Sequence, residues 1–276
     1  MKTVLVVANE TLGGRPLLAK LKEKAQQEEL RVVVCVPRTN PRQGNIIYDE
    51  AVFDAAQVRI DLARKILREE GIEAIGEVGD PDPYTATMDA IAEHHPDEIV
   101  ISTMPVASSG WLRRDLVERI AEATQLPVEL IVVYLDQEGL PFGVTLAVAN
   151  RTAASPIFLE ALKGRAAEPE QHVFIFVIPQ EGGHGVAARQ ARARLTQVID
   201  RARAAGLICA GMIGDPDPYT AVMNGVQFFR VDDIVISTLP ETRSGWMRAD
   251  LIERVRRASN KPVEHVVATD AAEAAA

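Results

Sequence analysis

A long internal repeat limits the folds open to this chain more than any other feature. The segment from Gly79 to Val133 matches the segment from Gly214 to Ala268 with a constant shift of 135 residues and no gap, and 29 of the 55 aligned positions are identical. Upstream, Val-Ala-Asn at 7–9 matches Val-Ala-Asn at 148–150. A period this long indicates a duplicated domain, because solenoid units run to about 20–50 residues. Both copies should therefore share one fold.

The chain length agrees with two domains. Its 276 residues exceed the roughly 250 at which single cores stop growing efficiently, and typical domains have about 100–150. We place the first copy at 1–138 and the second at 139–276, with a linker at about 136–142 that contains Gly139 and Pro141. The second copy lacks the stretch that corresponds to 39–49 of the first.

Short apolar runs alternate with helical patterns in each copy. In the first copy, the runs rich in β-branched residues predict five buried strands, at 4–8, 31–36, 72–78, 98–102 and 128–134. Helical spacing and good helix formers predict helices at 15–28, 51–70, 84–94 and 112–124. This alternation predicts an α/β fold, in which each copy is a doubly wound, five-stranded parallel sheet of order 3-2-1-4-5 with helices on both faces.

Charge and composition exclude several classes of protein. The net charge of −9 argues against nucleic acid and anionic lipid as partners. No stretch reaches the roughly 20 apolar residues of a membrane helix, and the apolar start is too short for a signal peptide. Cys35 and Cys209 lie in apolar runs at non-equivalent places, which predicts neither a disulfide nor a zinc site. We expect a cytoplasmic protein.

The predicted sheet order points to two loops in each copy. Ligands of such sheets bind at the carboxyl ends of the strands where the winding reverses, here strands 1 and 4. The loops after strand 1 are residues 9–14 and 150–155, and the loops after strand 4 are residues 102–111 and 237–246. Any binding site is therefore expected there.

The segment from Glu98 to Val133 resembles the carboxyl-terminal half of a universal stress protein domain. The resemblance lies in Glu-Ile-Val-Ile-Ser-Thr-Met-Pro, Ser-Gly-Trp-Leu-Arg-Arg-Asp-Leu-Val-Glu-Arg and Leu-Pro-Val, which the second copy largely repeats. Gly-Asp-Pro at 79–81 and 214–216 adds to it. The resemblance covers the chain as two domains and implies a pseudo-twofold pair that imitates a homodimer of single-domain relatives. A further homodimer is compatible with it.

Members of that family that bind ATP resemble one another in a loop with three spaced glycines followed by serine or threonine. That spacing falls here on Ser102, Pro105, Asp115 and Leu116, and in the second copy on Ser237, Pro240, Asp250 and Leu251. The spacing is kept, but the residues differ. A phosphate loop works through backbone N–H groups, and proline lacks that donor. The resemblance therefore implies a degenerate ATP loop.

Asp115 and Asp250 allow two interpretations. Each is followed three residues later by glutamate, Glu118 and Glu253, a pattern typical of a helix N-cap, so each carboxylate is expected to accept from the first N–H groups of the next helix. An aspartate about 4 Å from a phosphate would oppose it by roughly 4 kcal/mol at an effective dielectric near 20. Mg²⁺ between the two would reverse that sign, so ATP or ADP with Mg²⁺ stays open.

Other polar residues are better explained as structural. Asp82 and Asp217 each precede a proline that opens a helix, which predicts caps rather than acid/base or metal sites, with Asp80 and Asp215 beside them. No nucleophile elbow surrounds the Ser-Thr pairs at 102–103 and 237–238. The five histidines are scattered, and His94 and His95 are matched by Phe229 and Arg230, so we expect neither a metal site nor catalytic residues.

These patterns favour a non-enzymatic, stress-associated or regulatory protein with weak or absent nucleotide binding. A slowly hydrolysing or simply ATP-binding protein, and a partner-binding scaffold without a small ligand, are the alternatives. Arg243 replaces the serine at 108, which predicts unequal pockets. The candidate pocket residues are Asn9, Ser102, Thr103, Ser109, Gly110, Arg113 and Asp115 in the first copy, and Asn150, Ser237, Thr238, Arg243, Ser244, Gly245, Arg248 and Asp250 in the second.

Overall fold

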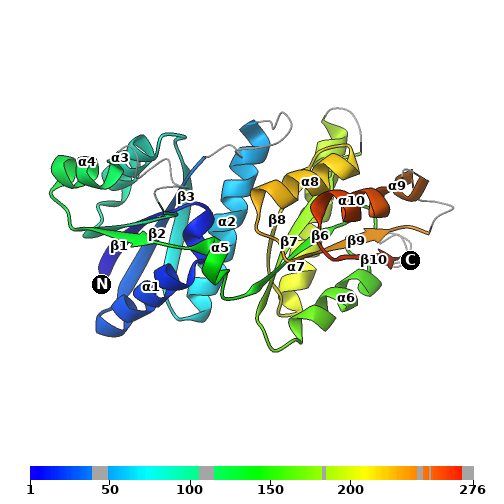
Figure 1. Ribbon diagram of the computed structural model, residues 1–276, viewed down its shortest axis with the longest axis horizontal. Helices are drawn as coiled ribbons and strands as arrows, with labels where there is room; N and C mark the ends of the chain where they lie inside the picture. The colour runs from blue at the N-terminus through cyan, green and yellow to red at the C-terminus, as the bar shows by residue number, and fades with distance from the viewer. Residues whose placement is uncertain (39–48, 106–114, 182–184, 241–244, 249, 269–276) are drawn as a thin grey trace. The chain divides into compact units, whose positions relative to one another are not determined.

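The computed structural model divides into two compact units, residues 1–40 with 55–141, and residues 41–54 with 142–276. It describes residues 1–38, 49–105, 115–181, 185–240, 245–248 and 250–268 (Figure 1). The predicted junction at 138/139 and the predicted twofold relation between the copies stay predictions.

The first unit is built on a five-stranded parallel sheet of order β3-β2-β1-β4-β5. Its strands are β1 (Lys2–Val7), β2 (Leu30–Pro37), β3 (Glu73–Gly79), β4 (Glu98–Thr103) and β5 (Val128–Val132). Its helices are α1 (Arg15–Gln27), α2 (Asp49–Glu69, of which residues 55–69 belong to this unit), α3 (Pro83–His94), α4 (Leu116–Thr124) and α5 (Leu135–Glu138), with a 3₁₀ turn, η1 (Glu10–Gly13). The predicted sheet order is confirmed, and the predicted start of the fourth helix at 112 lies outside the described residues.

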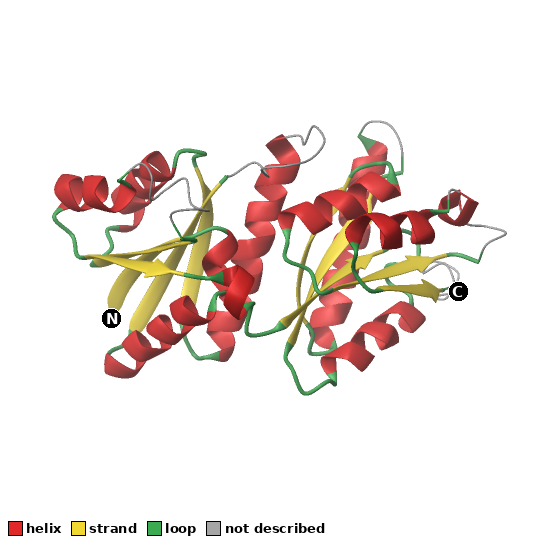
Figure 2. Ribbon diagram, in the orientation of Figure 1, coloured by secondary structure: helices red, strands yellow, loops and turns green. Residues whose placement is uncertain are grey.

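The second unit repeats this arrangement with the order β10-β9-β6-β7-β8. Its strands are β6 (Gly143–Val148), β7 (His172–Pro179), β8 (Ile208–Gly214), β9 (Asp233–Thr238) and β10 (Val263–Val267). Its helices are α6 (Pro156–Ala166), α7 (Val186–Ala204), α8 (Pro218–Phe228), α9 (Gly245–Arg248) and α10 (Leu251–Ser259). Figure 2 shows helices on both faces of each sheet. The doubly wound α/β architecture is thus present in both copies.

Buried β-branched strands explain why each sheet forms. All six residues of β4 and of β6 are buried, as is expected of parallel strands covered on both faces. In the first unit Leu5, Cys35 and Ile101 pack with α3 and α4, and in the second Phe176 packs with Phe158 of α6. Both cysteines are buried thiols. No helix in the described part of the chain is long and apolar enough to cross a membrane.

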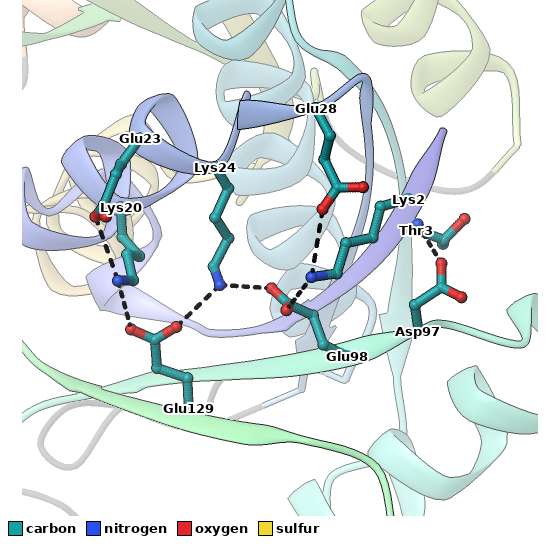
Figure 3. Close-up of polar contacts among 9 residues, drawn as sticks. All are labelled: Lys2, Thr3, Lys20, Glu23, Lys24, Glu28, Asp97, Glu98 and Glu129. Atoms are coloured by element: carbon teal, nitrogen blue, oxygen red, sulfur yellow. Dashed lines mark hydrogen bonds and ion pairs between the residues drawn. The ribbon is translucent and has the colours of Figure 1, made fainter. Parts of the chain in front are cut away.

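Ion pairs join the amino-terminal ends of the strands, opposite to the candidate site. In the first unit Glu98 of β4 accepts from Lys2 and from Lys24 of α1, each at 2.7 Å, and Lys24 and Lys20 also contact Glu129 of β5, each at 3.1 Å (Figure 3). In the second unit, one arginine forms the equivalent ion pairs. Arg165 of α6 contacts Asp233 of β9 at 3.2 Å and Glu264 of β10 at 2.5 Å.

Candidate functional site

The candidate site of each copy lies at the carboxyl ends of its first and fourth strands. In the first unit these are β1 and β4, and in the second β6 and β9, which are neighbours at the centre of each sheet. The chain leaves β1 through η1 and reaches α1 on one face, while the connections from β3 to β5 run through α3 and α4. This is the reversal point at which the sequence places a site.

A buried threonine ties the two loops together in each copy. The Thr11 hydroxyl donates to the carbonyl oxygen of Ser102 at 2.9 Å, and the Thr152 hydroxyl donates to that of Ser237 at 3.1 Å. Both threonines are buried, so these hydrogen bonds join the two loops inside the protein and not at its surface. Neither threonine was among the predicted site residues, although the recurrence of Asn-x-Thr at 9–11 and 150–152 is a signal for them.

Four buried polar atoms at this end of the sheets have no hydrogen-bond partner among the described residues. They are the hydroxyls of Ser102, Ser155 and Ser237 and the side-chain oxygen of Asn9, whose amide nitrogen donates to Pro37 at 3.4 Å. All three serines are almost fully buried, at 0%, 0% and 1% exposure. A buried polar group without a partner costs about 1–3 kcal/mol, which a bound water or ligand would recover.

The second copy has an open cavity of about 140 Å³ at this position. Most of the residues that line it have polar side chains. Trp246 of α9 is the one aromatic residue in the lining. The lining residues are Asn150, Arg151, Thr152, Glu181, Ser237, Thr238, Leu239, Gly245 and Trp246. Six of these nine carry a hydroxyl, amide or charged side chain, so the cavity suits a small polar ligand.

An arginine of the protein itself binds the side chain of Asn150, one of the predicted pocket residues. Arg194 of α7 donates to the side-chain oxygen of Asn150 at 2.6 Å and lies 3.7 Å from the Glu181 carboxylate. Sequence comparison of the copies could not reveal Arg194, because α7 lies outside the gapless repeat. In the first loop, Arg151 of the second copy stands where the first copy has Glu10. The two sites therefore differ in charge.

A histidine reaches the second site from the edge strand. The Thr238 hydroxyl donates to the carbonyl oxygen of Leu239 at 2.9 Å, and its oxygen lies 2.8 Å from Nε2 of His265. Since the hydroxyl has one hydrogen, Nε2 is placed to donate to it. Burial, and then the charge of Arg256, lower the pKa of His265. His265 was not among the predicted site residues, and Leu130 stands at this position in the first copy.

The predicted capping role of Asp115 and Asp250 is wrong. Both residues precede their helices, α4 and α10, but neither carboxylate makes a capping hydrogen bond. Their φ angles are 47° and 55°, in the left-handed region, whereas a side chain that caps a helix leaves from an extended residue. The backbone here has the conformation that glycine adopts most easily, with an aspartate in its place.

The other predicted caps are confirmed. Asp82 accepts from the Thr85 N–H at 3.1 Å, and Asp217 accepts from the Thr220 N–H at 2.9 Å. Two residues earlier in each turn, Asp80 accepts from the Asp82 N–H and Asp215 accepts from the Asp217 N–H, each at 2.8 Å. These aspartates therefore serve the start of α3 and α8.

Several predicted pocket residues lie outside the described residues or only at their margin. Ser109, Gly110, Arg113, Arg243 and Ser244 are outside, and only the backbone of Arg248 is described. Of the predicted set, the structure brings Asn150, Ser237, Thr238 and Gly245 together around the cavity, and it places Asn9, Ser102 and Thr103 at the equivalent end of the first sheet. Asp115 and Asp250 begin the helices that follow.

No protein-family model and no curated protein matches the chain. Among solved structures it is similar to a universal stress protein in complex with cAMP, at 15% identity and a TM-score of 0.33, over 48% of this chain and 97% of that one. It is also similar to a universal stress protein from Archaeoglobus fulgidus DSM 4304, at 14% identity and a TM-score of 0.36 over 97% of each chain. A protein of unknown function from Pseudomonas aeruginosa PAO1 is similar at 17% identity and a TM-score of 0.32, over 97% of this chain and 93% of that one. Similarities this low say nothing about the chemistry of the site, which depends on the residues described above.

Proposed function

We propose that this chain is a two-domain protein of the universal stress protein type, acting as a non-enzymatic regulatory or stress-associated module that binds nucleotides weakly or not at all. The observation that carries the proposal is the internal ion pair of the second site. Arg194 lies 3.7 Å from the Glu181 carboxylate, which lines the cavity, and it donates to the side-chain oxygen of Asn150 at 2.6 Å. A ligand that needs this amide has to displace an arginine and approach a carboxylate.

The charge of Glu181 opposes a phosphate ligand. Because Glu181 is 48% exposed and paired with Arg194, its repulsion of a phosphate is about 1 kcal/mol or less. The cavity of about 140 Å³ is also smaller than the roughly 300–1,000 Å³ that pockets for drug-sized ligands occupy. Both features favour weak or absent ATP binding over a tight nucleotide site.

The loops after β4 and β9 also disfavour tight binding of a phosphate. Pro105 and Pro240 stand where ATP-binding relatives have a glycine, and each removes one backbone donor from a phosphate cradle. Asp115 and Asp250 add a carboxylate to each loop, uncompensated by a capping bond. A cytoplasmic regulatory role without catalysis is the function that this set of residues suits best.

ATP binding is the second candidate, and two observations favour it. The hydroxyls of Ser102 and Ser237 are buried without a partner among the described residues, as they would be if a ligand or water completed them. Asp115 and Asp250 also keep the left-handed backbone of a glycine loop. In this case their carboxylates would bind Mg²⁺ between themselves and the phosphates.

Calorimetric titration of the whole chain with ATP, with and without Mg²⁺, separates the two candidates. We expect no binding, or a Kd above about 0.1 mM, for the wild type. Glu181→Gln should tighten any binding, because it removes the repulsion, while Glu168→Gln, at an exposed position, should change nothing. Tight Mg²⁺-dependent binding that is lost in the double variant Asp115→Gly, Asp250→Gly would overturn the proposal in favour of the second candidate.

A further inference from the structure

We propose that the first copy carries a binding site for a divalent transition-metal ion, formed by Glu77, Glu93 and His94. These three side chains each offer one ligand atom, and the three atoms all lie within 4.8 Å of one another. The His94 Nε2 atom lies 3.2 Å from a carboxylate oxygen of Glu77. The site is separate from the ends of β1 and β4, so it does not depend on the proposed function.

The fold brings these residues together from two neighbouring elements. Glu77 lies on β3, the edge strand of the first sheet, in register with Cys35 of β2. Helix α3 packs over these strands and ends at His94, because His95 takes a left-handed conformation with φ 46°. The last turn of α3 therefore holds Glu93 and His94 beside the strand. Both elements are held by the core, so the ligands are positioned by rigid structure.

The distances suit a tetrahedral metal ion. Two ligand atoms bound tetrahedrally at about 2.1 Å from zinc lie about 3.4 Å apart, close to the 3.2 Å between His94 Nε2 and the Glu77 oxygen. Glu93 is exposed, and bringing its oxygen from at most 4.8 Å to about 3.4 Å from the other ligand atoms needs a shift of at most about 1.4 Å of its flexible side chain. One imidazole with two carboxylates favours Zn²⁺ among cellular ions, with water in the fourth position.

The charge around these residues favours a cation. No lysine or arginine in the described part of the chain forms an ion pair with Glu77 or Glu93. Cys35 is not a ligand, because its thiol donates to the carbonyl of Ala86 at 3.6 Å. Burial, and then the charges of Glu77 and Asp89, raise the pKa of that thiol to about 12. The carboxylates of Glu77 and Glu93 are therefore not neutralised by a lysine or arginine of the described residues.

The second copy shows that the fold does not need polar residues here. Met212 occupies the position of Glu77, and Phe228 and Phe229 occupy those of Glu93 and His94. The two phenylalanines are buried, at 4% and 7% exposure, with their ring centroids 6.2 Å apart. The same backbone thus accepts an apolar cluster in one copy. In the other copy, all three positions carry metal-ligand side chains.

Zinc titration of the metal-stripped full chain tests the site, with Co²⁺ as a spectroscopic probe. We expect one Zn²⁺ per chain with a Kd below about 0.1 mM, and Co²⁺ absorption of a four- or five-coordinate ion. His94→Gln and Glu77→Gln should each weaken binding about tenfold or more. His95→Asn is the matched control, since asparagine tolerates the left-handed backbone and the ligands stay in place; its affinity should match the wild type.

Folding of each variant is checked by its far-ultraviolet circular dichroism, and added Zn²⁺ should raise the Tm of the wild type and of His95→Asn but not of His94→Gln. A wild type that binds no Zn²⁺ below about 0.1 mM overturns the site. Equal affinity in folded His94→Gln and Glu77→Gln also overturns it, because the ion would then be held by other residues.

Discussion

Replacing Glu98 by glutamine removes the centre of the ion-pair network in the first unit. The Glu98 carboxylate is 10% exposed and accepts from Lys2 and Lys24, each at 2.7 Å (Figure 3). Burial alone would raise the pKa of Glu98, but hydrogen bonds from the two lysines outweigh it and lower the pKa below 4.5. Glutamine keeps the shape and removes the charge, so the two ammonium groups lose their shared partner.

The expected loss of stability lies between two limits. Removing one partner of a fully buried ion pair costs about 3–5 kcal/mol, and an exposed pair contributes about 0–1 kcal/mol. Lys2 and Lys24 are 30% and 17% exposed. Lys24 also keeps Glu129 at 3.1 Å. We therefore expect Glu98→Gln to lower the free energy of unfolding by about 2 kcal/mol, or the Tm of the unit by about 6 °C.

Urea denaturation of wild type and variant measures this loss. Glu23→Gln is the control, because Glu23 is 57% exposed and contacts only Lys20 among the described residues, and its cost should stay below about 0.5 kcal/mol. Since the folded pKa of Glu98 is lowered, its contribution is full above about pH 4.5 and is lost as the pH falls through that lowered pKa, so the stabilities of the two proteins should converge in acid. A Glu98→Gln cost as small as that of Glu23→Gln would refute the reasoning.

Three further changes test local features of the fold. Asp82→Ala should cost about 1 kcal/mol in urea denaturation, because it removes the acceptor of the Thr85 N–H, and Asp82→Asn should restore most of it; equal stability of Ala and wild type would contradict the cap. Gly79→Ala should cost about 1–3 kcal/mol, since its Cβ would lie 2.6 Å from that of Ala86, and an unchanged Tm would contradict this packing. Asp250→Gly should match or exceed wild-type stability, whereas Asp250→Ala should lose about 1 kcal/mol, because φ is 55° there; the reverse order would contradict the left-handed backbone.

The fold could be predicted because its signals are local and repeated. Apolar runs without polar alternation indicated buried parallel strands, and the alternation with helices led to the sheet order that both units have. The observed strand ends differ from the predicted ones by a residue or two, as at β1, which begins at Lys2 rather than Val4. Lys2 is joined to the sheet through its backbone and its contact with Glu98, and neither signal appears in an apolar pattern.

The contrast between Asp82 and Asp115 explains where the site prediction failed. Both have the sequence pattern of a cap, but Pro83 follows Asp82 and favours the extended conformation that a capping residue needs. Asp115 is followed by a leucine, which does not restrict the backbone of the residue before it as a proline does. The φ angle of Asp115 is 47°. The residue types were therefore informative only where proline also restricted the backbone.

Contacts between segments far apart in the sequence also could not be predicted. Arg194 reaches Asn150 from α7, where the copies differ in sequence, so the repeat gave no reason to pair the two. Glu77 and His94 meet only because α3 packs over β3. Such pairs depend on how helices are placed on the sheet, which periodicity alone does not specify.

Mass spectrometry of the small molecules released when the purified full chain is denatured tests the proposed function most directly. A protein whose sites bind nucleotide weakly or not at all should lose it during purification, so we expect far less than one adenine nucleotide per chain. Release of ATP, ADP or another adenine nucleotide at close to one per chain or more would contradict the proposal, because only a tight site retains its ligand through purification.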